Sequence, residues 1–350
     1  MESVLGFFSK DLGIDLGTAN TLVVARGEGI VISEPTVVAV YKGTNKIVVS
    51  AQGPAVGERA RQMLGKTPDS IQAIRPLRHG VIADFEICQA MLTYFIQKAH
   101  GRRGLARPRV IIAVPSGITT VEKRAVINSA ERAGAREVRL IREPMAAAIG
   151  CGLPVREPRG SMIVDIGGGT SECAILSLDD LVLSNSLRVA GDDMNRAIQD
   201  YLRQVYNLAI GEHAAERIKI EVGSAYRLEE ELTREVRGKD TVAGLPRSVL
   251  LRSEEVREAL MPVLEQVVKG IQATLEKLTP ELHDDLYETG ITLAGGGALI
   301  RGLDRLIARE TGLPVRRADD PLTAVARGVG MVLEQLETFW HVLEQTHEFA

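Results

Sequence analysis

The chain has 350 residues, of which 45% are hydrophobic and 25% are charged. This composition is ample for a packed core, and the length predicts two or three domains. The net charge of −4 does not favour nucleic-acid binding. Cys88, Cys151 and Cys173 lie far apart without metal-ligand spacing, so we expect reduced core residues rather than a metal site.

The N-terminus does not have the features of a signal peptide. It lacks a basic leading region, and Lys10 and Asp11 interrupt its apolar stretch. No apolar run along the chain reaches the ~18–20 residues that a bilayer span needs. We therefore expect a cytoplasmic protein.

Strands and helices alternate along most of the chain, which indicates an α/β fold. Thr119, Thr120 and Glu122 are candidate caps for one of the helices. In the first half we expect a hairpin formed by 36–41 and 46–50, strands at 109–114 and 138–141, and helices over 53–64, 82–100, 119–133 and 144–150. In the second half we expect a hairpin over 160–178, a strand over 290–294, and helices over 192–206, 213–226, 253–278, 298–310 and 322–339.

One local pattern occurs twice, as LGIDLGTANTLVVA at residues 12–25 and as MIVDIGGGTSECAIL at residues 162–176. Each copy is an apolar β run, an aspartate, a tight turn rich in Gly and Thr, and a second apolar β run. Asp15 and Asp165 occupy the same place in the two copies. Two matched hairpins predict a duplicated fold whose halves bind one anion, such as a nucleotide triphosphate with Mg²⁺.

The two turns have the composition of a phosphate-binding site. Glycines allow close backbone approach, and consecutive amides in a turn form an anion-binding concavity. Asp15 and Asp165 would then hold Mg²⁺, mainly through its water shell. The alternative is that Asp-Gly pairs simply make hairpin turns. The Gly-rich lysine motif of P-loop proteins is absent from the sequence.

A third glycine cluster, Gly295, Gly296 and Gly297, lies between an expected strand and an expected helix. A helix N-terminus with flanking glycines suits a nucleotide. The alternative is an ordinary tight strand–helix connection.

These motifs resemble the actin/sugar-kinase/heat-shock-chaperone ATPase superfamily and, within it, the MreB family of bacterial actins. The resemblance runs in register from about residue 10 to residue 338. The segment EPMAAAIG at 143–150 also matches the superfamily. The matches specific to the MreB family are GIDLGTANTL at 13–22, VAGDDM at 189–194, IGEHAAERIK at 210–219, GLPR at 244–247 and PLTAVA at 321–326.

The resemblance implies a duplicated actin-like (ribonuclease H-like) α/β fold with two lobes of two subdomains each around a nucleotide cleft. It implies subdomain IA at 10–33, 78–150 and 319–338, IB at 34–77, IIA at 151–182 and 247–318, and IIB at 183–246. Residues 1–9 would be an amphipathic membrane-binding segment and residues 339–350 a C-terminal extension, which continues the last helix or contacts a partner.

The resemblance also implies the residues that bind ATP and Mg²⁺. Asp15 and Asp165 would serve the metal. On sequence alone, a solvated i,i+3 ion pair is the better interpretation of Glu216 and Lys219. The implied phosphate-binding residues are Gly17, Thr18, Ala19, Asn20, Gly167, Gly168, Gly169 and Thr170, and those for ribose and adenine are Glu216, Lys219, Gly295, Gly296, Gly297 and Ala298.

Hydrolysis requires a group that orients a water in line with the γ-phosphate. The glutamine that actin uses is not evident, and Glu143 is the matching candidate, with Thr170 as the γ-phosphate sensor and Asp165 completing the catalytic set. Glu143 would alternatively only cap the helix beginning at Pro144. Asn20 stands where actin has a lysine, so the backbone and Mg²⁺ must neutralise more of the phosphate charge.

Two segments are candidates for membrane contact. The first is the N-terminus, where an apolar cluster precedes Lys10, as suits a lipid interface; the alternative is a disordered or self-packed tail. The second is the loop at 101–107, where Leu105 lies among three arginines that attract anionic headgroups; the alternative is a solvated basic turn. The expected lipid-contacting residues are Val4, Leu5, Phe7, Phe8 and Leu105.

The sequence therefore predicts a slow ATPase that assembles into membrane-associated filaments, which the resemblance implies to be paired and antiparallel. The implied role is maintenance of rod cell shape by organising the cell-wall elongation machinery at the inner face of the membrane. The alternatives are a non-polymerising chaperone-like ATPase or a metabolite kinase of the same superfamily. The chain ends too soon for the first, and no acceptor-site motif supports the second.

Overall fold

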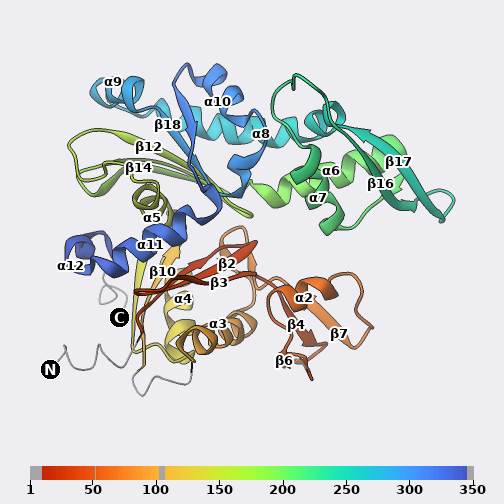
Figure 1. Cartoon of the computed structure of the whole chain (residues 1–350), viewed down its shortest axis with the longest axis horizontal. Coiled ribbons are helices and arrows are strands. Elements are labelled where there is room, and N and C mark those ends of the chain that lie inside the picture. Colours follow the sequence, from red (N-terminus) through yellow and green to blue (C-terminus); the bar gives the residue numbers. More distant parts are fainter. Residues whose placement is uncertain (1–9, 52, 102–106, 345–350) are drawn as a thin grey trace. The chain divides into compact units, whose positions relative to one another are not determined.

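The computed structural model describes residues 10–51, 53–101 and 107–344 (Figure 1). The chain forms two compact units. The first comprises the chain up to Pro158, Leu176–Leu181 and the part from Leu322 onward. The second comprises Arg159–Ile175 and Val182–Pro321.

The first unit is built on a five-stranded sheet with the order β11-β10-β1-β2-β3. Three strands that follow one another in the chain are antiparallel neighbours, and β10 and β11 add to β1 in parallel. Their bounds are β1 Leu12–Leu16, β2 Asn20–Ala25, β3 Gly29–Pro35, β10 Arg109–Val114 and β11 Glu137–Arg142.

Both faces of this sheet are covered. Alternate side chains of a strand point to opposite faces, so neighbouring residues of β1 contact different helices. Leu12, Ile14 and Leu16 belong to the core that contains the buried side chains of α3, Phe85–His100, and α4, Thr120–Arg132. Gly13, between them, faces Val329 of α11, Ala324–Glu334.

Helix α11 lies against α5, Glu143–Gly150, at a crossing made by glycines (Figure 1). A Cβ added to Gly150 would lie 1.9 Å from the carbonyl oxygen of Ala324, and one added to Gly328 would lie 1.8 Å from that of Ala146. Backbone atoms cannot move aside as a flexible side chain can. The two helices therefore pack at a separation that only glycine permits at these positions.

A smaller group of elements follows β3. Its strand β4, Val38–Tyr41, is the antiparallel partner of β7, Ile71–Ile74, and a small apolar cluster around Val37, Ala39 and Ala60 forms its core. The remaining elements here are β5 Val49–Ser50, β6 Gly53–Pro54, α2 Glu58–Met63, β8 Leu77–Arg78 and β9 Val81–Ile82.

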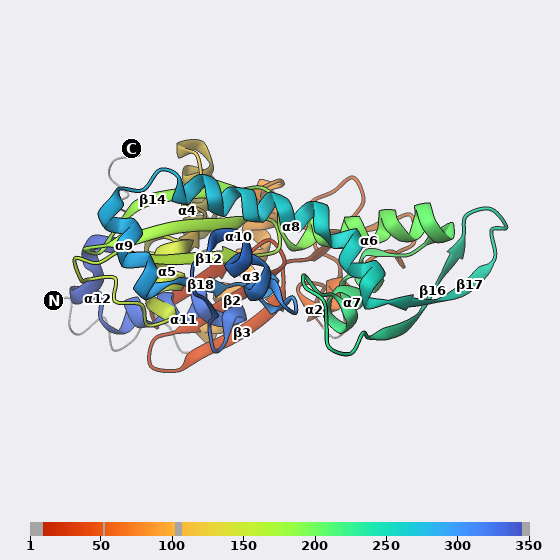
Figure 2. The same cartoon turned by 90° about the horizontal axis from the view of Figure 1, so that it is seen from above.

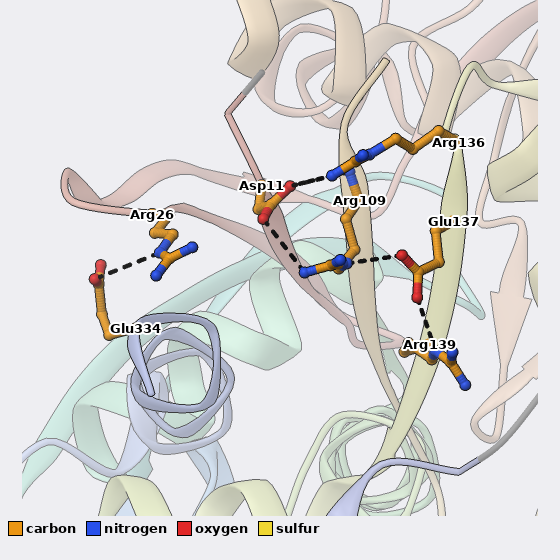
Figure 3. A network of polar contacts seen from close by, with 7 residues as sticks. All are labelled: Asp11, Arg26, Arg109, Arg136, Glu137, Arg139 and Glu334. Atoms are coloured by element: carbon orange, nitrogen blue, oxygen red, sulfur yellow. Dashed lines mark hydrogen bonds and ion pairs between the residues drawn. The ribbon is translucent and has the colours of Figure 1, made fainter. Parts of the chain in front are cut away.

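A charged network lies at the amino ends of the parallel strands (Figure 3). Arg109, which begins β10, donates to Glu137 Oε2 at 2.8 Å, and its guanidinium lies 3.8 Å from Asp11 Oδ2. Arg139 donates to the other oxygen of Glu137 at 3.0 Å, and Arg136 lies 3.7 Å from Asp11 Oδ1. These pairs connect the starts of three strands, at the end opposite to Asp15.

The second unit repeats the plan with a five-stranded sheet of order β14-β13-β12-β18-β19. Strands β12 to β14 follow one another in the chain, and β18 and β19 add to β12 in parallel. The bounds are β12 Ser161–Ile166, β13 Ser171–Ser177, β14 Asp180–Leu187, β18 Ile291–Ala294 and β19 Val315–Arg317. This shared order confirms the predicted duplication.

Helices pack their buried side chains with Met162, Val164 and Ile166 of β12 in one core. Beside α6 and α7, the strands β16 and β17 form a long antiparallel hairpin (Figure 2). The bounds in this part are α6 Gly191–Tyr206, β15 Leu208–Ala209, α7 Glu212–Val222, β16 Thr233–Asp240, β17 Pro246–Arg252, α8 Ser253–Leu275, α9 Pro280–Thr289, η2 Gly296–Leu299 and α10 Leu303–Thr311.

Several predicted bounds were wrong. The helix expected over 82–100 begins at Phe85, because Asp84 caps it by accepting from the Ile87 N–H at 3.0 Å. The region 53–64 contains a short strand before a six-residue helix. The segment 298–310 begins with a 3₁₀ turn before α10, and 322–339 divides into η3 Pro321–Thr323, α11 and α12 Leu336–Phe339.

The segment after α12 does not continue the helix. After the 3₁₀ turn η4, Trp340–Val342, the backbone N–H of Glu344 donates to the carbonyl of Leu140 at 2.9 Å. Its carboxylate accepts from Arg142 at 3.1 Å and also pairs with Lys123. The start of the C-terminal extension is therefore attached to the first unit beside strand β11, while residues 345–350 lie outside the described residues.

Candidate functional site

The first predicted phosphate turn connects β1 to β2 and is held by Thr36, the residue that follows β3. Thr36 donates through Oγ1 to the carbonyl of Gly17 at 2.7 Å and through its backbone N–H to that of Ala19 at 2.9 Å. Thr21 Oγ1 lies 2.9 Å from Thr36 Oγ1, and Thr18 Oγ1 accepts from the Gly80 N–H at 3.1 Å. The turn is therefore held in one shape, as an anion-binding turn requires.

Asp15 lies near the carboxyl end of β1, where it pairs with Ala113 of β10 and Leu22 of β2. Burial raises the pKa of its carboxyl to about 7. A carboxyl group with so little hydration is suited to bind a cation, because a bound positive charge would favour its ionised form.

The second turn connects β12 to β13 and closes with a hydrogen bond from the Gly167 N–H to the Thr170 carbonyl at 2.9 Å. Two carbonyl groups of this turn accept hydrogen bonds from backbone N–H groups at the start of α6. The Gly191 N–H donates to Gly167 at 3.1 Å, and the Asp192 N–H donates to Gly168 at 2.8 Å. The sequence motif at 189–194 is thus attached directly to the second hairpin.

The third glycine cluster lies against the same hairpin. Asp165 pairs with Ala294 across the parallel strands β12 and β18. A Cβ on Gly295, whose φ is +78°, would lie 2.3 Å from Asp165 Oδ1 and 2.4 Å from the carbonyl oxygen of Ile166. Only glycine allows the backbone to approach the aspartate this closely.

Helix α7 contacts the start of α6 through Lys219, whose Nζ donates to the Gly191 carbonyl at 2.9 Å. Glu216 lies 3.8 Å from His213 Nδ1 on the same helix. Sequence reasoning missed the positioning role of Gly191 and Asp192. The helix over 192–206 was expected, but the hydrogen bonds from its first residues to the hairpin join residues that are more than twenty positions apart, so no local signal indicates them.

Within the second unit, four stretches that are distant in the sequence therefore meet. They are the hairpin turn at 167–170, the start of α6, Lys219 of α7 and the Gly295–Gly297 segment. Carboxylate, backbone amide and lysine groups converge here, a combination that can bind a phosphorylated ligand.

Glu143 is the first residue of α5 and is only 9% exposed. The N-cap residue is Arg142, which makes no side-chain capping bond. The negative charge of Glu143 in the first helical turn is favoured by the helix dipole. Thr170 is likewise buried, as is Asp165.

The expected cap of α4 is confirmed. Thr119 and Glu122 form a reciprocal capping box, in which the Thr119 N–H donates to Glu122 Oε2 at 2.8 Å. Of the cysteines, Cys88 and Cys173 are buried, and burial raises the pKa of each thiol to about 12. Cys151 is only half-buried, so its expected place in the core was wrong.

The predicted lipid-contacting residues Val4, Leu5, Phe7, Phe8 and Leu105 lie outside the described residues. Across the described ranges 10–51, 53–101 and 107–344, no helix is both long and apolar enough to cross a membrane.

Comparison with known proteins decides the family. A family model described as MreB/Mbl protein matches residues 9–341. The chain is 52% identical over 341 residues to the cell shape-determining protein MreB of Escherichia coli strain K12, an alignment that covers 96% of this chain and 97% of the relative. The chain belongs to the MreB/Mbl family. It is also 45% identical over 332 residues to the cell shape-determining protein Mbl of Bacillus subtilis strain 168, covering 94% of this chain and 97% of that one.

Solved structures agree with this membership. MreB5 of Spiroplasma citri, bound to AMPPNP, is 36% identical and superposes with a TM-score of 0.89 over 95% of this chain and 98% of that one. A MamK double helical filament, 22% identical, has a TM-score of 0.77 over 93% of this chain and 98% of that chain, which shows the shared fold. The actin-like fold predicted from the sequence is confirmed, and the chain is a cytoskeletal protein of the cell-shape-determining MreB/Mbl family.

Proposed function

We propose that this MreB/Mbl chain binds ATP with Mg²⁺ and hydrolyses it slowly as it assembles into filaments. The observation that carries the proposal is the internal duplication. In each unit an aspartate is the next-to-last residue of the strand that begins a hairpin, and it pairs with the neighbouring parallel strand. MreB5 of Spiroplasma citri, 36% identical, has been solved with AMPPNP and with ADP, which supports nucleotide binding here.

The proposed phosphate contacts come from both hairpin turns. Backbone amides next to glycine can approach phosphate oxygens closely, and the turns are held by the Thr36 and Gly191 contacts described above. The proposed phosphate-binding residues are Gly17, Thr18, Ala19, Asn20, Gly167, Gly168, Gly169 and Thr170. The proposed ribose- and adenine-binding residues are Glu216, Lys219, Gly295, Gly296, Gly297 and Ala298.

Asp15 and Asp165 fit a role in holding Mg²⁺. Carboxylate oxygens are hard ligands that suit this ion, which usually keeps much of its water shell. A nearby positive charge would favour the ionised form of the buried Asp15 carboxyl, whose pKa is raised to about 7. When bound, Mg²⁺ would neutralise phosphate charge, which matters here because Asn20 supplies no cation.

We assign hydrolysis to Glu143, with Thr170 and Asp165. Glu143 is buried at the start of α5, so its carboxylate is held in a restricted position from which it would orient the attacking water. Thr170 would sense the γ-phosphate and report it to the helices behind it. Assembly would bring a neighbouring subunit that triggers turnover.

The further proposals concern partners and location. We propose paired antiparallel protofilaments on the inner face of the cytoplasmic membrane, where they organise the cell-wall elongation machinery. Residues 1–9 and Leu105 would supply the lipid contact. Each anchor alone is weak, at roughly 1.5–3 kcal/mol per buried large side chain, and a filament multiplies it by avidity.

Deletion of residues 1–9 tests the anchor. The deleted protein is expected to assemble with Mg-ATP as the full chain does, but to sediment less with anionic liposomes. Equal co-sedimentation of the two proteins would remove the anchor from the proposal. Loss of assembly itself would show that the segment has a structural role instead.

A further inference from the structure

Arg301, six residues after Gly295, joins this glycine segment to the end of α7. Its Nη1 donates to the carbonyl oxygen of Ile220 at 3.0 Å and to that of Gly223 at 3.3 Å. These oxygens belong to the last turn and the C-cap of α7, where carbonyls lack partners within the helix. A guanidinium is favoured here by the helix dipole as well.

The backbone around Arg301 fixes the same junction. The Ala225 N–H donates to the Arg301 carbonyl at 2.7 Å, and Ser224 pairs with Arg301 in an isolated parallel bridge. Gly302 has a φ of +73°, and a Cβ there would lie 2.6 Å from the Cβ of Tyr226. The chain therefore makes close contact on both sides of the arginine.

The connection from Arg301 back to the glycine segment is short and well packed. The Ile300 N–H donates to the Gly297 carbonyl at 3.1 Å, and the Leu303 N–H donates to the Ile300 carbonyl at 3.2 Å. Ile300 is itself only 6% exposed. A shift of Arg301 would therefore move Gly297 as well.

Helix α7, which Arg301 joins to the glycine segment, is also held at the second hairpin. Helix α7 carries Glu216 and Lys219, and Lys219 is bonded to Gly191 beside the second hairpin. Helix α7 is thus held toward the hairpin by Lys219 and toward the 295–302 segment by Arg301.

We propose that Arg301 is a positioning residue for nucleoside recognition. It sets the separation between α7 and the Gly295–Ala298 segment, the two elements proposed to flank ribose and adenine. The inference rests on the proposed function, because it concerns the same nucleotide. Arg301 does not touch the ligand, and it acts through the carbonyls of Ile220 and Gly223.

The test compares ligands with and without a nucleoside. We would measure the affinities of Mg-ATP, Mg-ADP and Mg-tripolyphosphate by competition against a fluorescent ATP analogue. Arg301→Met removes the charge and keeps the aliphatic stem, and Arg301→Lys keeps the charge. Arg305→Met, an exposed arginine of α10, is the matched control. Thr170→Val, on the proposed phosphate side, is the contrasting variant.

Arg301→Met is expected to weaken Mg-ATP and Mg-ADP about tenfold, because α7 and the Gly295–Ala298 segment would no longer be held at the separation that the nucleoside needs, while tripolyphosphate affinity stays unchanged. Arg301→Lys should recover part of the loss, and Thr170→Val should weaken Mg-ATP and tripolyphosphate together. Equal weakening of all three ligands by Arg301→Met, or no weakening, would overturn the positioning role.

Two further outcomes are distinguished from failure of the positioning role: absence of Mg-ATP binding in the wild-type chain, and unfolding of Arg301→Met. If the wild-type chain does not bind Mg-ATP, the proposed function fails first. If Arg301→Met unfolds, the comparison of Arg301→Lys with wild type tests the positioning role, because lysine keeps the positive charge but lacks the planar fork of the guanidinium. An unchanged ratio of Mg-ATP to tripolyphosphate affinity in that variant contradicts the inference.

Discussion

Lys219 Nζ lies 2.9 Å from the carbonyl oxygen of Gly191, and the N–H of Gly191 in turn donates to Gly167 in the second hairpin turn. The ammonium group thus holds the start of α6 beside the proposed phosphate site. Gly191 leaves little room for a side chain, because an added Cβ would lie 3.3 Å from Lys219 Nζ and 3.1 Å from the Gly167 carbonyl oxygen.

Lys219→Met is therefore expected to weaken Mg-ATP binding about tenfold, since a half-buried bond from a charged donor is lost. In contrast to Arg301→Met, this variant should weaken tripolyphosphate binding too, because the hairpin turn itself loses support. Isothermal titration of both ligands would check this. The control is Lys269→Met on the exposed side of α8, which should bind as wild type. Unaltered affinity in Lys219→Met would refute the contribution of this bond.

Gly328→Ala is expected to destabilise the first unit by about 1–3 kcal/mol. The new methyl would lie 1.8 Å from the carbonyl oxygen of Ala146, so α5 and α11 must separate. Gly330→Ala on the same helix is the matched control, because its methyl meets a movable methyl of Val24 at 3.1 Å. Urea unfolding of the two variants should give a lower midpoint for Gly328→Ala alone. Equal midpoints would mean that the crossing is not sterically limited.

Glu137 predicts a pH dependence of stability. Burial alone would raise the pKa of its carboxyl, but hydrogen bonds from Arg109 and Arg139 hold that pKa below the ordinary value of 4.5. A lowered folded-state pKa means that the stabilisation is fully present above pH 4.5 and is lost as the pH falls through the folded-state value.

Glu137→Gln should thus cost about 1 kcal/mol near neutral pH, since the partners are partly exposed, and the difference from wild type should shrink in acid. Urea unfolding as a function of pH measures this. A difference that stays constant down to the acid limit would exclude the titration of Glu137 as its source.

Glu143→Ala is expected to keep Mg-ATP binding and to lose phosphate release, because the water would no longer be oriented. Phosphate release by assembled protein is the measurement. Glu137→Gln, at the other end of the sheet, serves as the control and should retain turnover. Wild-type turnover in Glu143→Ala would end the assignment of this residue.

The duplicated hairpins could be predicted from the sequence because the signals are local. An aspartate followed by glycine and threonine between two apolar runs specifies a strand, a turn and a strand within fifteen residues. The buried helix α3 was also predictable in type from its apolar period, although Asp84 rather than Ile82 marks its start.

The parts that could not be predicted depend on tertiary contacts. Strand β16 has a single large apolar side chain, that of Val236, and β17 has only the short run Val249 to Leu251, and most residues of the two strands taken together are exposed. The apolar signal is therefore too short to mark this hairpin. Likewise, the bonds from Lys219 to Gly191 and from Arg301 to Ile220 join residues 28 and 81 positions apart. On sequence alone Glu216 and Lys219 fitted a mutual ion pair, whereas Glu216 lies near His213 and Lys219 bonds to backbone.

Electron microscopy of the purified chain with Mg-ATP, with and without anionic liposomes, is the most direct test of nucleotide-dependent filament assembly. We expect straight filaments in Mg-ATP that are denser or paired on lipid. Monomers under every nucleotide and lipid condition, with ATP still bound, would contradict assembly and favour a non-polymerising ATPase of the same fold.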